Sequence, residues 1–330
     1  MAFKILSFCG GGIRGLASVA MLNVLQQKTG NANIAQDADM LAGTSTGSSI
    51  VAALARKKDR APETAAELIN FFRTSELKFF KNQNYLVSKP GYDVKDIAAD
   101  MELKYLGIKL KDLPQRVLMT AFNVGDAAKK IDWQPVLFHN FPFSTVSETP
   151  LADAVVSSGA MPGMLGSHKD NVDGSFVHHD PTLAAIALAV RGGHKLSDIV
   201  VICFGTGFMG NSLGKETANW GAYQWQHGTP DDPNPDYYHL QPLLVNGSIS
   251  PILNISLNGT STNLVPDLSG MMLADPQLGS YSRYAYLNPK LKGFIPENEY
   301  NLDVLDYLQE VAEHTVDFTK ATELVTKYWV

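Results

Sequence analysis

The sequence predicts an α/β protein in which a mostly parallel central sheet is covered by helices on both faces. Short, mainly apolar runs that end at glycine-rich turns alternate with helical segments from residue 3 to residue 207. This alternation is typical of the strand-helix-strand units of a parallel sheet, and the apolar character of the runs indicates strands buried on both faces. In such sheets the reactive groups lie at the carboxyl ends of the strands.

Individual elements follow from their start and stop signals. The helix before Gly192 has Asp180 as its expected N-cap and Pro181 at its first position. Strands are predicted at 3–9, within 37–47, and at 116–124, 134–141 and 198–207. Helices are predicted at 16–27, 48–56, 65–80, 151–158, 181–191 and 302–327.

The chain has 330 residues, enough for one large α/β domain or two modest ones, and no repeat or linker divides it. We therefore expect one domain over 1–330, with its motifs in a core at about 3–207 and a less clearly patterned C-terminal part at 208–330. A hydrophobic content of 45% against 18% charged residues is typical of a folded protein and excludes a disordered chain.

Charge and cysteine content narrow the classes of function. A formal net charge of -6 argues against a phosphate-tracking surface and thus against nucleic acid as a partner. Cys9 and Cys203 are the two cysteines, so we expect no disulfide framework and a reducing compartment. No run approaches the roughly 20 apolar residues of a membrane-spanning helix. Glycines and Arg14 interrupt the first apolar run, which argues against a signal peptide and favours a cytoplasmic location.

The stretch LAGTSTGSSI contains Ser45 in the pattern GxSxG, between a predicted strand and a predicted helix. This is the pattern of a nucleophile elbow, in which a sharp turn exposes the serine oxygen. Gly43 and Gly47 suit such a turn because a Cβ at either position would clash with the backbone that approaches it. The pattern alone leaves open whether Ser45 is a nucleophile or a hydroxyl in a turn.

A second glycine-rich turn, CGGGIRG, follows the first predicted strand. The amides of Gly10, Gly11 and Gly12 can converge on one point and hold the oxyanion of an acyl-transfer intermediate, with Arg14 bracing the loop or holding an anionic head group. Alternatively, two of these glycines and Gly15 form a GxGxxG nucleotide loop. That interpretation requires an acidic residue at the end of a second strand, whereas the nearest acidic residues lie at the start of one.

A serine nucleophile needs a base, and two kinds of candidate are present. Asp173 begins an Asp-Gly turn in NVDGSF, where its carboxylate either reaches the serine directly or is an ordinary turn residue. Three histidines crowd the same stretch and offer a different base: His168, His178 and His179.

Together these stretches resemble the patatin-like phospholipase family. The resemblance rests on GGGIRG near the amino terminus, GTSTG about 30 residues later, and the Asp-Gly pair followed by HHDPTLAAIALA. TPLADAVVSSGAMPGML and CFGTG add to it, whereas beyond residue 207 the best match is YYHLQP. The resemblance implies the patatin-like three-layer sandwich.

The resemblance also implies a serine-aspartate dyad. Ser45 is then the nucleophile and Asp173 the general base, the three histidines are bystanders, and neither a metal nor a cofactor is needed. The other implied site residues are Gly10, Gly11, Gly12, Arg14 and Gly15 of the oxyanion hole, Gly43, Thr44, Thr46 and Gly47 of the nucleophile elbow, and Gly174 and Ser175 of the Asp-Gly motif.

Three positions depart from the family pattern. Cys9 stands where many members have Asp, Ser175 where many have Gly or Ala, and Asp180 where Asn is usual. Cys9 changes the hydrogen bonding beneath the oxyanion loop. None of the three departures removes a dyad residue.

The implied function is hydrolysis of fatty acyl esters of phospholipids or related lipids through an acyl-enzyme. Acyl transfer to an alcohol by the same dyad stays open, as does a non-catalytic module whose glycine loop binds a phosphate or nucleotide. A lipid substrate requires transient contact with a membrane surface. Leu77, Phe79, Phe80 and Tyr85 are candidates for that contact, or else pack into the core. Some family members are switched on by a ligand, and a site for an activating ligand or protein would lie after residue 207.

Overall fold

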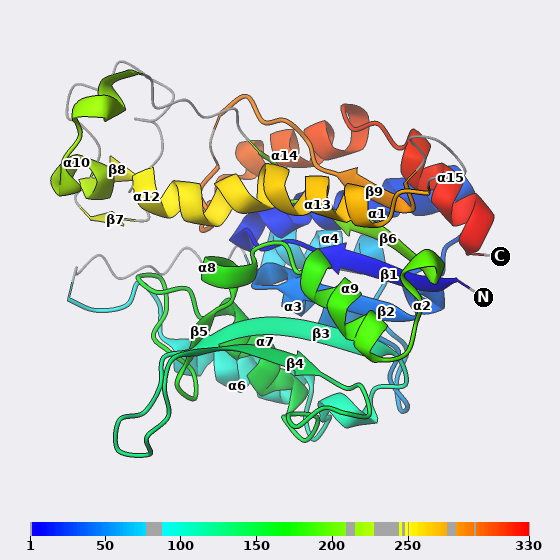
Figure 1. Cartoon of the computed structure of the whole chain (residues 1–330), viewed down its shortest axis with the longest axis horizontal. Helices are drawn as coiled ribbons and strands as arrows, with labels where there is room; N and C mark the ends of the chain where they lie inside the picture. Colours follow the sequence, from blue (N-terminus) through cyan, green and yellow to red (C-terminus); the bar gives the residue numbers. More distant parts are fainter. Residues whose placement is uncertain are drawn as a thin grey trace.

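A mixed sheet of seven strands lies at the centre of the described part of the chain (Figure 1). The computed structural model describes residues 2–76, 88–208, 215–227, 244–245, 248–249, 251–275, 282–293 and 295–329. The strand order is β4-β3-β2-β1-β6-β9, and β5 pairs with β3. The strands are β1 (Phe3–Phe8), β2 (Met40–Thr44), β3 (Arg116–Asn123), β4 (Gln134–His139), β5 (Asn171–Asp173), β6 (Ile199–Phe204) and β9 (Tyr284–Leu287). A separate antiparallel pair consists of β7 (Leu244–Val245) and β8 (Ser248–Ile249).

Most of the strand pairs are parallel, as predicted. β1 lies between β2 and β6 and is parallel to both, β2 is parallel to β3, and β6 is parallel to β9. β4 and β5 run antiparallel to β3. Parallel neighbours require long crossover connections, and helices lie in the segments between them.

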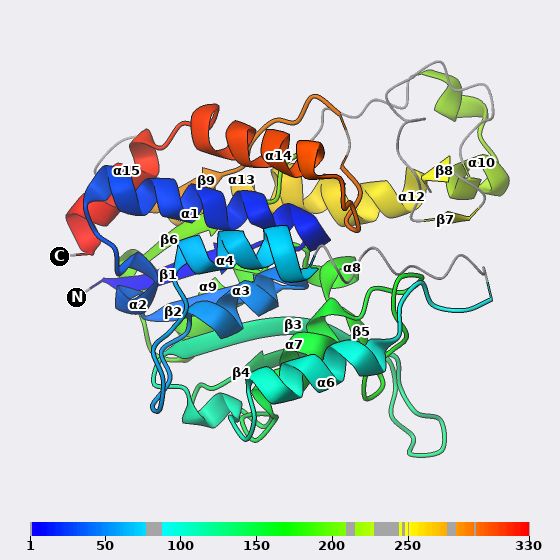
Figure 2. The same cartoon turned by 180° about the vertical axis from the view of Figure 1, so that it is seen from behind.

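Helices cover both faces of the sheet, which confirms the predicted fold class. One face, nearer the viewer in Figure 2, carries α1 (Gly15–Thr29), α3 (Thr46–Leu54), α4 (Ala65–Phe71), α6 (Val94–Lys104), α7 (Leu151–Gly159), α14 (Leu302–His314) and α15 (Thr319–Tyr328). The opposite face carries α9 (Thr182–Arg191) and α13 (Val265–Met272). Successive strand side chains point to opposite faces of the sheet and enter two apolar cores. Leu41 lies in the core under α1, α3 and α14, whereas its neighbours Met40 and Ala42 lie in the core under α9.

The C-terminal part joins the same layers. β9 extends the sheet beside β6, and α14 packs against α1. Short helices are α2 (Ile34–Asp37), α8 (Ser175–His178), α10 (Ala222–His227) and α12 (Pro251–Asn254). The 3-10 turns are η1 (Gly12–Arg14), η3 (Leu110–Asp112), η4 (Leu196–Asp198) and η5 (Lys215–Asn219), and the π-helical segments are η2 (Phe72–Glu76) and η6 (Ile255–Leu264). Among the residues described, no helix combines the length and the apolar character needed to cross a bilayer.

The predicted helix 302–327 was wrong as a single element, because it is two helices. α14 ends at His314, and α15 begins at Thr319. The carboxylate of Asp317 accepts a hydrogen bond of 2.9 Å from the Thr319 amide, which satisfies a donor at a new helix start. Apolar periodicity continues across this break, so periodicity alone did not reveal it.

The predicted helix 65–80 begins as expected and then changes character. α4 has a capping box at Thr64 and Glu67, and it passes after Phe71 into the π-helical segment η2. The aromatic stretch 77–85, predicted to contact a membrane or the core, lies outside the described residues.

Candidate active site

Ser45 occupies a strained turn between β2 and α3. Its backbone angles, φ 55° and ψ -124°, lie in a region that non-glycine residues rarely adopt and that costs about 1–3 kcal/mol. The Ser45 amide donates to Ser158 Oγ at 2.8 Å, and its carbonyl accepts from the Ser48 hydroxyl at 2.6 Å. These contacts, with the strand before it and the helix after it, hold the backbone in this conformation.

Close backbone packing surrounds the turn. A Cβ on Gly43 would lie 2.2 Å from the Gly47 carbonyl oxygen, and one on Gly47 would lie 2.2 Å from the Phe8 carbonyl oxygen. The Thr44 hydroxyl lies 2.7 Å from the Thr120 hydroxyl and donates to the His178 carbonyl at 2.6 Å. The elbow is therefore tied both to the end of β1 and to α8.

Thr46 and Gly15 bring the glycine-rich loop against the elbow. Thr46 is the first residue of α3, and its side chain is buried. A Cβ on Gly15 would lie 2.6 Å from Thr46 Oγ1 and 2.8 Å from the Phe72 ring. Gly15 therefore permits close contact between α1 and α3.

Asp173 reaches the elbow because two strands pair in succession with one edge of β3. β2 pairs with the first part of β3 and ends at Thr44, which faces Thr120. Asp173 in β5 faces Ala121, the next residue along β3. β4 occupies the other edge of β3 over this length. β5 therefore continues the sheet at the point where β2 leaves it for the Ser45 turn.

The carboxyl group of Asp173 is fully buried. Its Oδ1 accepts a hydrogen bond of 2.7 Å from the Ser175 amide, and Oδ2 accepts none from the described residues. Burial raises the pKa of Asp173 to about 7, although the Ser45 hydroxyl and the Ser175 amide lower it. A Cβ on Gly174 would lie 2.4 Å from Thr120 Oγ1, so the Asp-Gly pair packs directly on β3.

The glycine-rich loop has fewer available amides than the sequence suggested. The Gly10 amide donates to the His179 carbonyl at 3.0 Å, and the Gly15 amide donates within the turn to the carbonyls of Gly12 and Ile13. Within the described residues, the amides of Gly11 and Gly12 make no hydrogen bond. Of the loop amides that were expected to hold an oxyanion, only those of Gly11 and Gly12 are therefore available as donors among the described residues.

A buried ion pair braces this loop from the C-terminal part of the chain. Arg14 donates to the Ile295 carbonyl at 2.9 Å and lies 3.6 Å from Glu297 Oε1. The Glu297 carbonyl accepts from the Ile13 amide at 2.8 Å, and a Cβ on Gly12 would lie 2.2 Å from that same carbonyl oxygen. Burial lowers the pKa of Arg14 and raises that of Glu297. Sequence reasoning missed Glu297, since no motif marks it.

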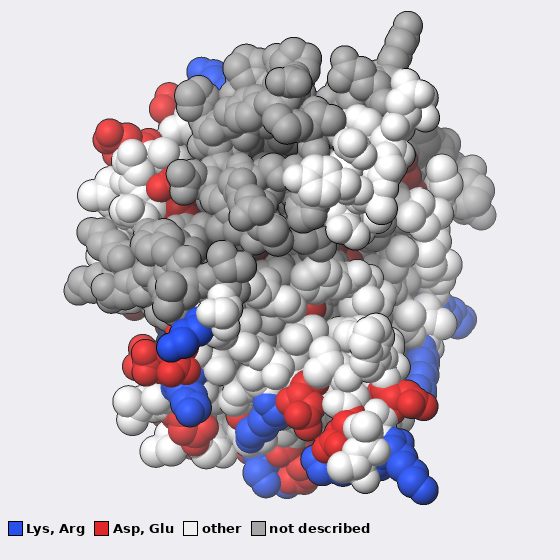
Figure 3. Space-filling view, turned by 90° about the vertical axis from the view of Figure 1, so that its left-hand side faces the viewer, with Lys and Arg blue, Asp and Glu red and all other residues white. Residues whose placement is uncertain are grey.

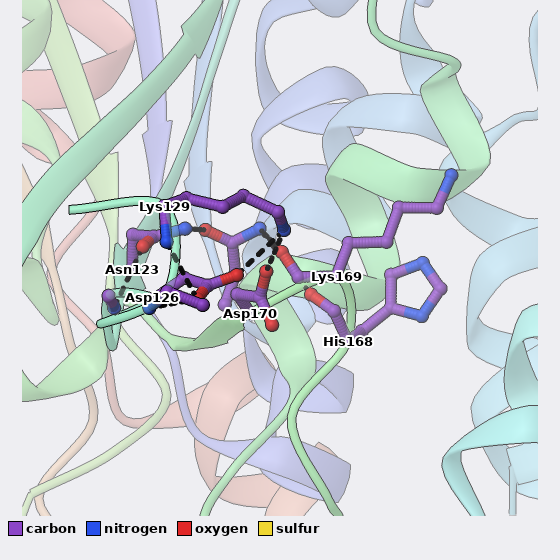
Figure 4. A network of polar contacts seen from close by, with 9 residues as sticks. Asn123, Asp126, Lys129, His168, Lys169 and Asp170 are labelled. Atoms are coloured by element: carbon purple, nitrogen blue, oxygen red, sulfur yellow. Dashed lines mark hydrogen bonds and ion pairs between the residues drawn. The ribbon is translucent and has the colours of Figure 1, made fainter. Parts of the chain in front are cut away.

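The histidines of this stretch lie in different surroundings. His168 Nε2 lies 2.8 Å from Asp153 Oδ1, and its ring points away from the charged cluster around Lys129 in Figure 4. That cluster, with Lys129 between Asp126 (2.7 Å) and Asp170 (3.9 Å), ties the turn after β3 to the loop before β5.

His179 lies behind the glycine-rich loop. A Cβ on Gly10 would lie 3.1 Å from its Nδ1. Burial, with the charge of Arg14, lowers the pKa of His179 to about 3. Its imidazole is therefore neutral near neutral pH, and its backbone carbonyl, rather than its side chain, holds the Gly10 amide.

A cavity of about 360 Å³ lies beside Ser45. Its walls are mainly apolar and come from Phe71, Ile97, Met101, Val155, Val156, Met161, Met164 and Leu165. Polar groups occur at Ser49, Ser75, Asp100, Lys104 and Glu297. Figure 3 shows the end of the molecule at which β5 and α8 lie. Its described surface is mainly uncharged, and charged side chains are most numerous at the lower edge, with others along the left edge.

Comparison with known sequences shows the family to which the chain belongs. The profile described as "Patatin-like phospholipase" matches residues 6–186, more than half of the chain. The match includes the glycine-rich loop, the elbow and the Asp-Gly motif. The chain belongs to the patatin-like phospholipase family, a family of lipid hydrolases, which confirms the resemblance predicted from the motifs.

Individual relatives span the whole chain. "Protein teg" of Priestia megaterium is 28% identical over 99% of this chain and 99% of its own length. "Putative sporulation hydrolase CotR" of Bacillus subtilis is 27% identical over 99% of this chain and 98% of its own. A more distant relative, "Probable inactive patatin-3-Kuras 1" of Solanum tuberosum, is 24% identical over 67% of this chain and 68% of its own.

Proposed function

We propose that this protein hydrolyses fatty acyl esters of phospholipids or related lipids through a Ser45–Asp173 dyad. The observation that carries the proposal is the buried Asp173 carboxyl beside a serine held in a strained elbow, next to an apolar cavity. Ser45 Oγ attacks the acyl carbon while Asp173 takes its proton. Asp173 then returns that proton to the leaving alcohol, and water releases the fatty acid from the acyl-enzyme.

The pKa of Asp173 supports its role as the base. A general base works best when its pKa lies near the operating pH, and burial brings that of Asp173 to about 7. Oδ2, which accepts no hydrogen bond from the described residues, is the oxygen free to receive the serine proton. The three nearby histidines have no part in this chemistry.

The amides of Gly11 and Gly12 are the proposed donors to the oxyanion. They are the loop amides that make no hydrogen bond within the described residues. Preorganised N–H donors of this kind typically contribute about a hundredfold or more in rate. The Arg14–Glu297 pair has the separate role of holding the loop, as a brace rather than a head-group site.

The cavity supports a lipid substrate. Its mainly apolar walls suit an acyl chain that extends from the ester bound at Ser45. A phosphate-binding module is less well supported, because Asp173 and Glu297 place two buried carboxyls close to the loop that would have to hold an anion. The predicted membrane contact at 77–85 and the predicted activator site after residue 207 stay predictions.

The test is release of fatty acid from vesicles of phospholipid, galactolipid and lysolipid. Ser45→Ala and Asp173→Ala are expected to lose activity by about a thousandfold or more. Ser197→Ala, at an exposed serine, is the matched control and should retain it. Unchanged activity in either dyad variant would refute the dyad, and products esterified to an added alcohol would identify a transferase.

One alternative base, His168, is tested in the same assay. His168→Ala is expected to keep most of its activity, because the ring pairs with Asp153. A loss as deep as that of Ser45→Ala would restore a histidine to the mechanism.

A further inference from the structure

Two cysteines and an aspartate form a buried cluster on the face of the sheet opposite the cavity. Cys9 follows β1, Cys203 lies in β6, and Asp180 precedes α9; each is at most 2% exposed. The two Sγ atoms are 3.7 Å apart, and Cys203 Sγ lies 3.6 Å from Asp180 Oδ2. All three ligand atoms lie within 4.8 Å of one another. The mechanism proposed above uses none of them.

The two separations that involve Cys203 match those of neighbouring ligands around one tetrahedral zinc ion. With Zn–S near 2.3 Å, tetrahedral angles place two sulfurs about 3.8 Å apart. With Zn–O of about 2.0–2.2 Å, a sulfur and an oxygen lie about 3.5–3.7 Å apart. Two thiolates and a carboxylate also suit Zn²⁺ better than Mg²⁺ or Ca²⁺, which prefer oxygen ligands.

A buried phenol provides a second, independent observation. Tyr284 in β9 is 8% exposed, and its hydroxyl has no hydrogen-bond partner among the described residues. It belongs to the same core as the two cysteines. An unpaired buried donor costs about 1–3 kcal/mol, so an acceptor is expected beside it.

The strand register argues against a disulfide as the role of the two thiols. Cys203 faces Ser7 in the parallel pairing of β1 with β6. Cys9 is two residues further along the chain than Ser7, so Cys9 and Cys203 are diagonal neighbours rather than directly opposite each other. With parallel strands about 4.8 Å apart and a rise of about 3.3 Å per residue, residues offset by two have Cα atoms roughly 8 Å apart. A disulfide usually needs Cα atoms within about 6.8 Å, whereas a bridging ion needs only the sulfurs to converge.

We propose that Cys9, Cys203 and Asp180 bind one Zn²⁺ ion. Two Zn–S bonds form as both thiols release their protons to solvent, and Asp180 Oδ2 supplies the third ligand. Three negative ligands against two positive charges leave one excess negative charge on the cluster.

The ion fixes the residue that immediately precedes Gly10. Zinc would therefore stabilise the start of the glycine-rich loop from the face of the sheet opposite the cavity. This consequence rests on the proposed function, but the metal site itself does not.

The site is tested by metal binding to the whole chain, without an activity assay. Protein stripped by a chelator, reloaded with Zn²⁺ and desalted is expected to retain one zinc per chain by elemental mass spectrometry. Co²⁺ in its place should give the visible bands of tetrahedral cobalt together with near-ultraviolet thiolate charge transfer. Cys9→Ser and Cys203→Ser should each lower the bound zinc at least about tenfold.

Asp153→Asn is the matched control, because it removes the carboxylate that pairs with His168 and leaves the cluster intact. It should retain the zinc. If a serine variant fails to fold, thermal unfolding of the wild type decides, since bound zinc is expected to raise its Tm. Zinc far below one equivalent, a cobalt spectrum without thiolate absorption, or a Cys9–Cys203 disulfide found by mass spectrometry would each overturn the proposal.

Discussion

Asp173→Asn is expected to abolish activity and yet to stabilise the fold at alkaline pH. Burial raises the pKa of this carboxyl from 3.8 to about 7. A group with a raised folded-state pKa contributes stability that is full below its unfolded pKa and is lost as pH rises through the folded pKa. A difference of about 3 pKa units, at 1.36 kcal/mol per unit, makes about 4 kcal/mol the upper bound of that loss. Asparagine does not lose this stability as pH rises, because its side chain is neutral at every pH and its oxygen can still accept a hydrogen bond from the Ser175 amide.

Urea unfolding of both proteins at a series of pH values measures this difference. Near pH 4 the free energies of unfolding should be similar, and from there to about pH 7 the asparagine variant should become increasingly more stable. Above that pH the gap should level off. Asp59→Asn, at an exposed position, controls for removal of a surface carboxylate. A gap that does not change with pH, or an asparagine variant that is less stable at alkaline pH, would refute a buried, ionisable Asp173.

The remaining predictions concern the same groups. The wild-type kcat/KM on a soluble ester should rise with pH through about 7 and then level, because Asp173 must be ionised to act as base; a flat acid limb would contradict this. Gly47→Ala should lower the free energy of unfolding by about 3 kcal/mol, since its Cβ meets backbone, whereas Gly270→Ala, with open space around it, should not. Glu297→Gln should cost about 3 kcal/mol by removing the carboxylate charge that faces the buried Arg14 guanidinium. Adding Arg14→Met should recover most of that stability in urea unfolding, and failure to recover it would argue against the ion pair.

The elements that carry local signals were predictable from the sequence. β1, β2, β3, β4 and β6 are apolar runs bounded by turns, and each lies where it was expected to within a few residues. The turn at Ser45 was predictable only in part, because Gly43 faces the nearby Gly47 carbonyl, whereas Gly47 faces the Phe8 carbonyl of β1. The predictable features depend mainly on residues that are close together in the sequence, so sequence patterns indicate them.

Features set by contacts between distant segments were not predictable. β5 has three residues, too few to show a period, and its position follows from the edge that β3 leaves open. The Gly10 amide was expected to be available, but its engagement depends on the His179 carbonyl. Glu297 reaches the site from a segment with no motif, and the Cys9–Cys203 contact needs the register of β1 with β6.

Covalent labelling at Ser45 tests the central claim most directly. A fluorophosphonate carrying an alkyl chain reacts with an activated serine, and mass spectrometry of the digested protein locates the adduct. One adduct per chain is expected on the peptide that contains Ser45, with none in Ser45→Ala and much slower formation in Asp173→Asn. An unlabelled wild type, or an adduct that persists in Ser45→Ala, would contradict a serine-aspartate hydrolase.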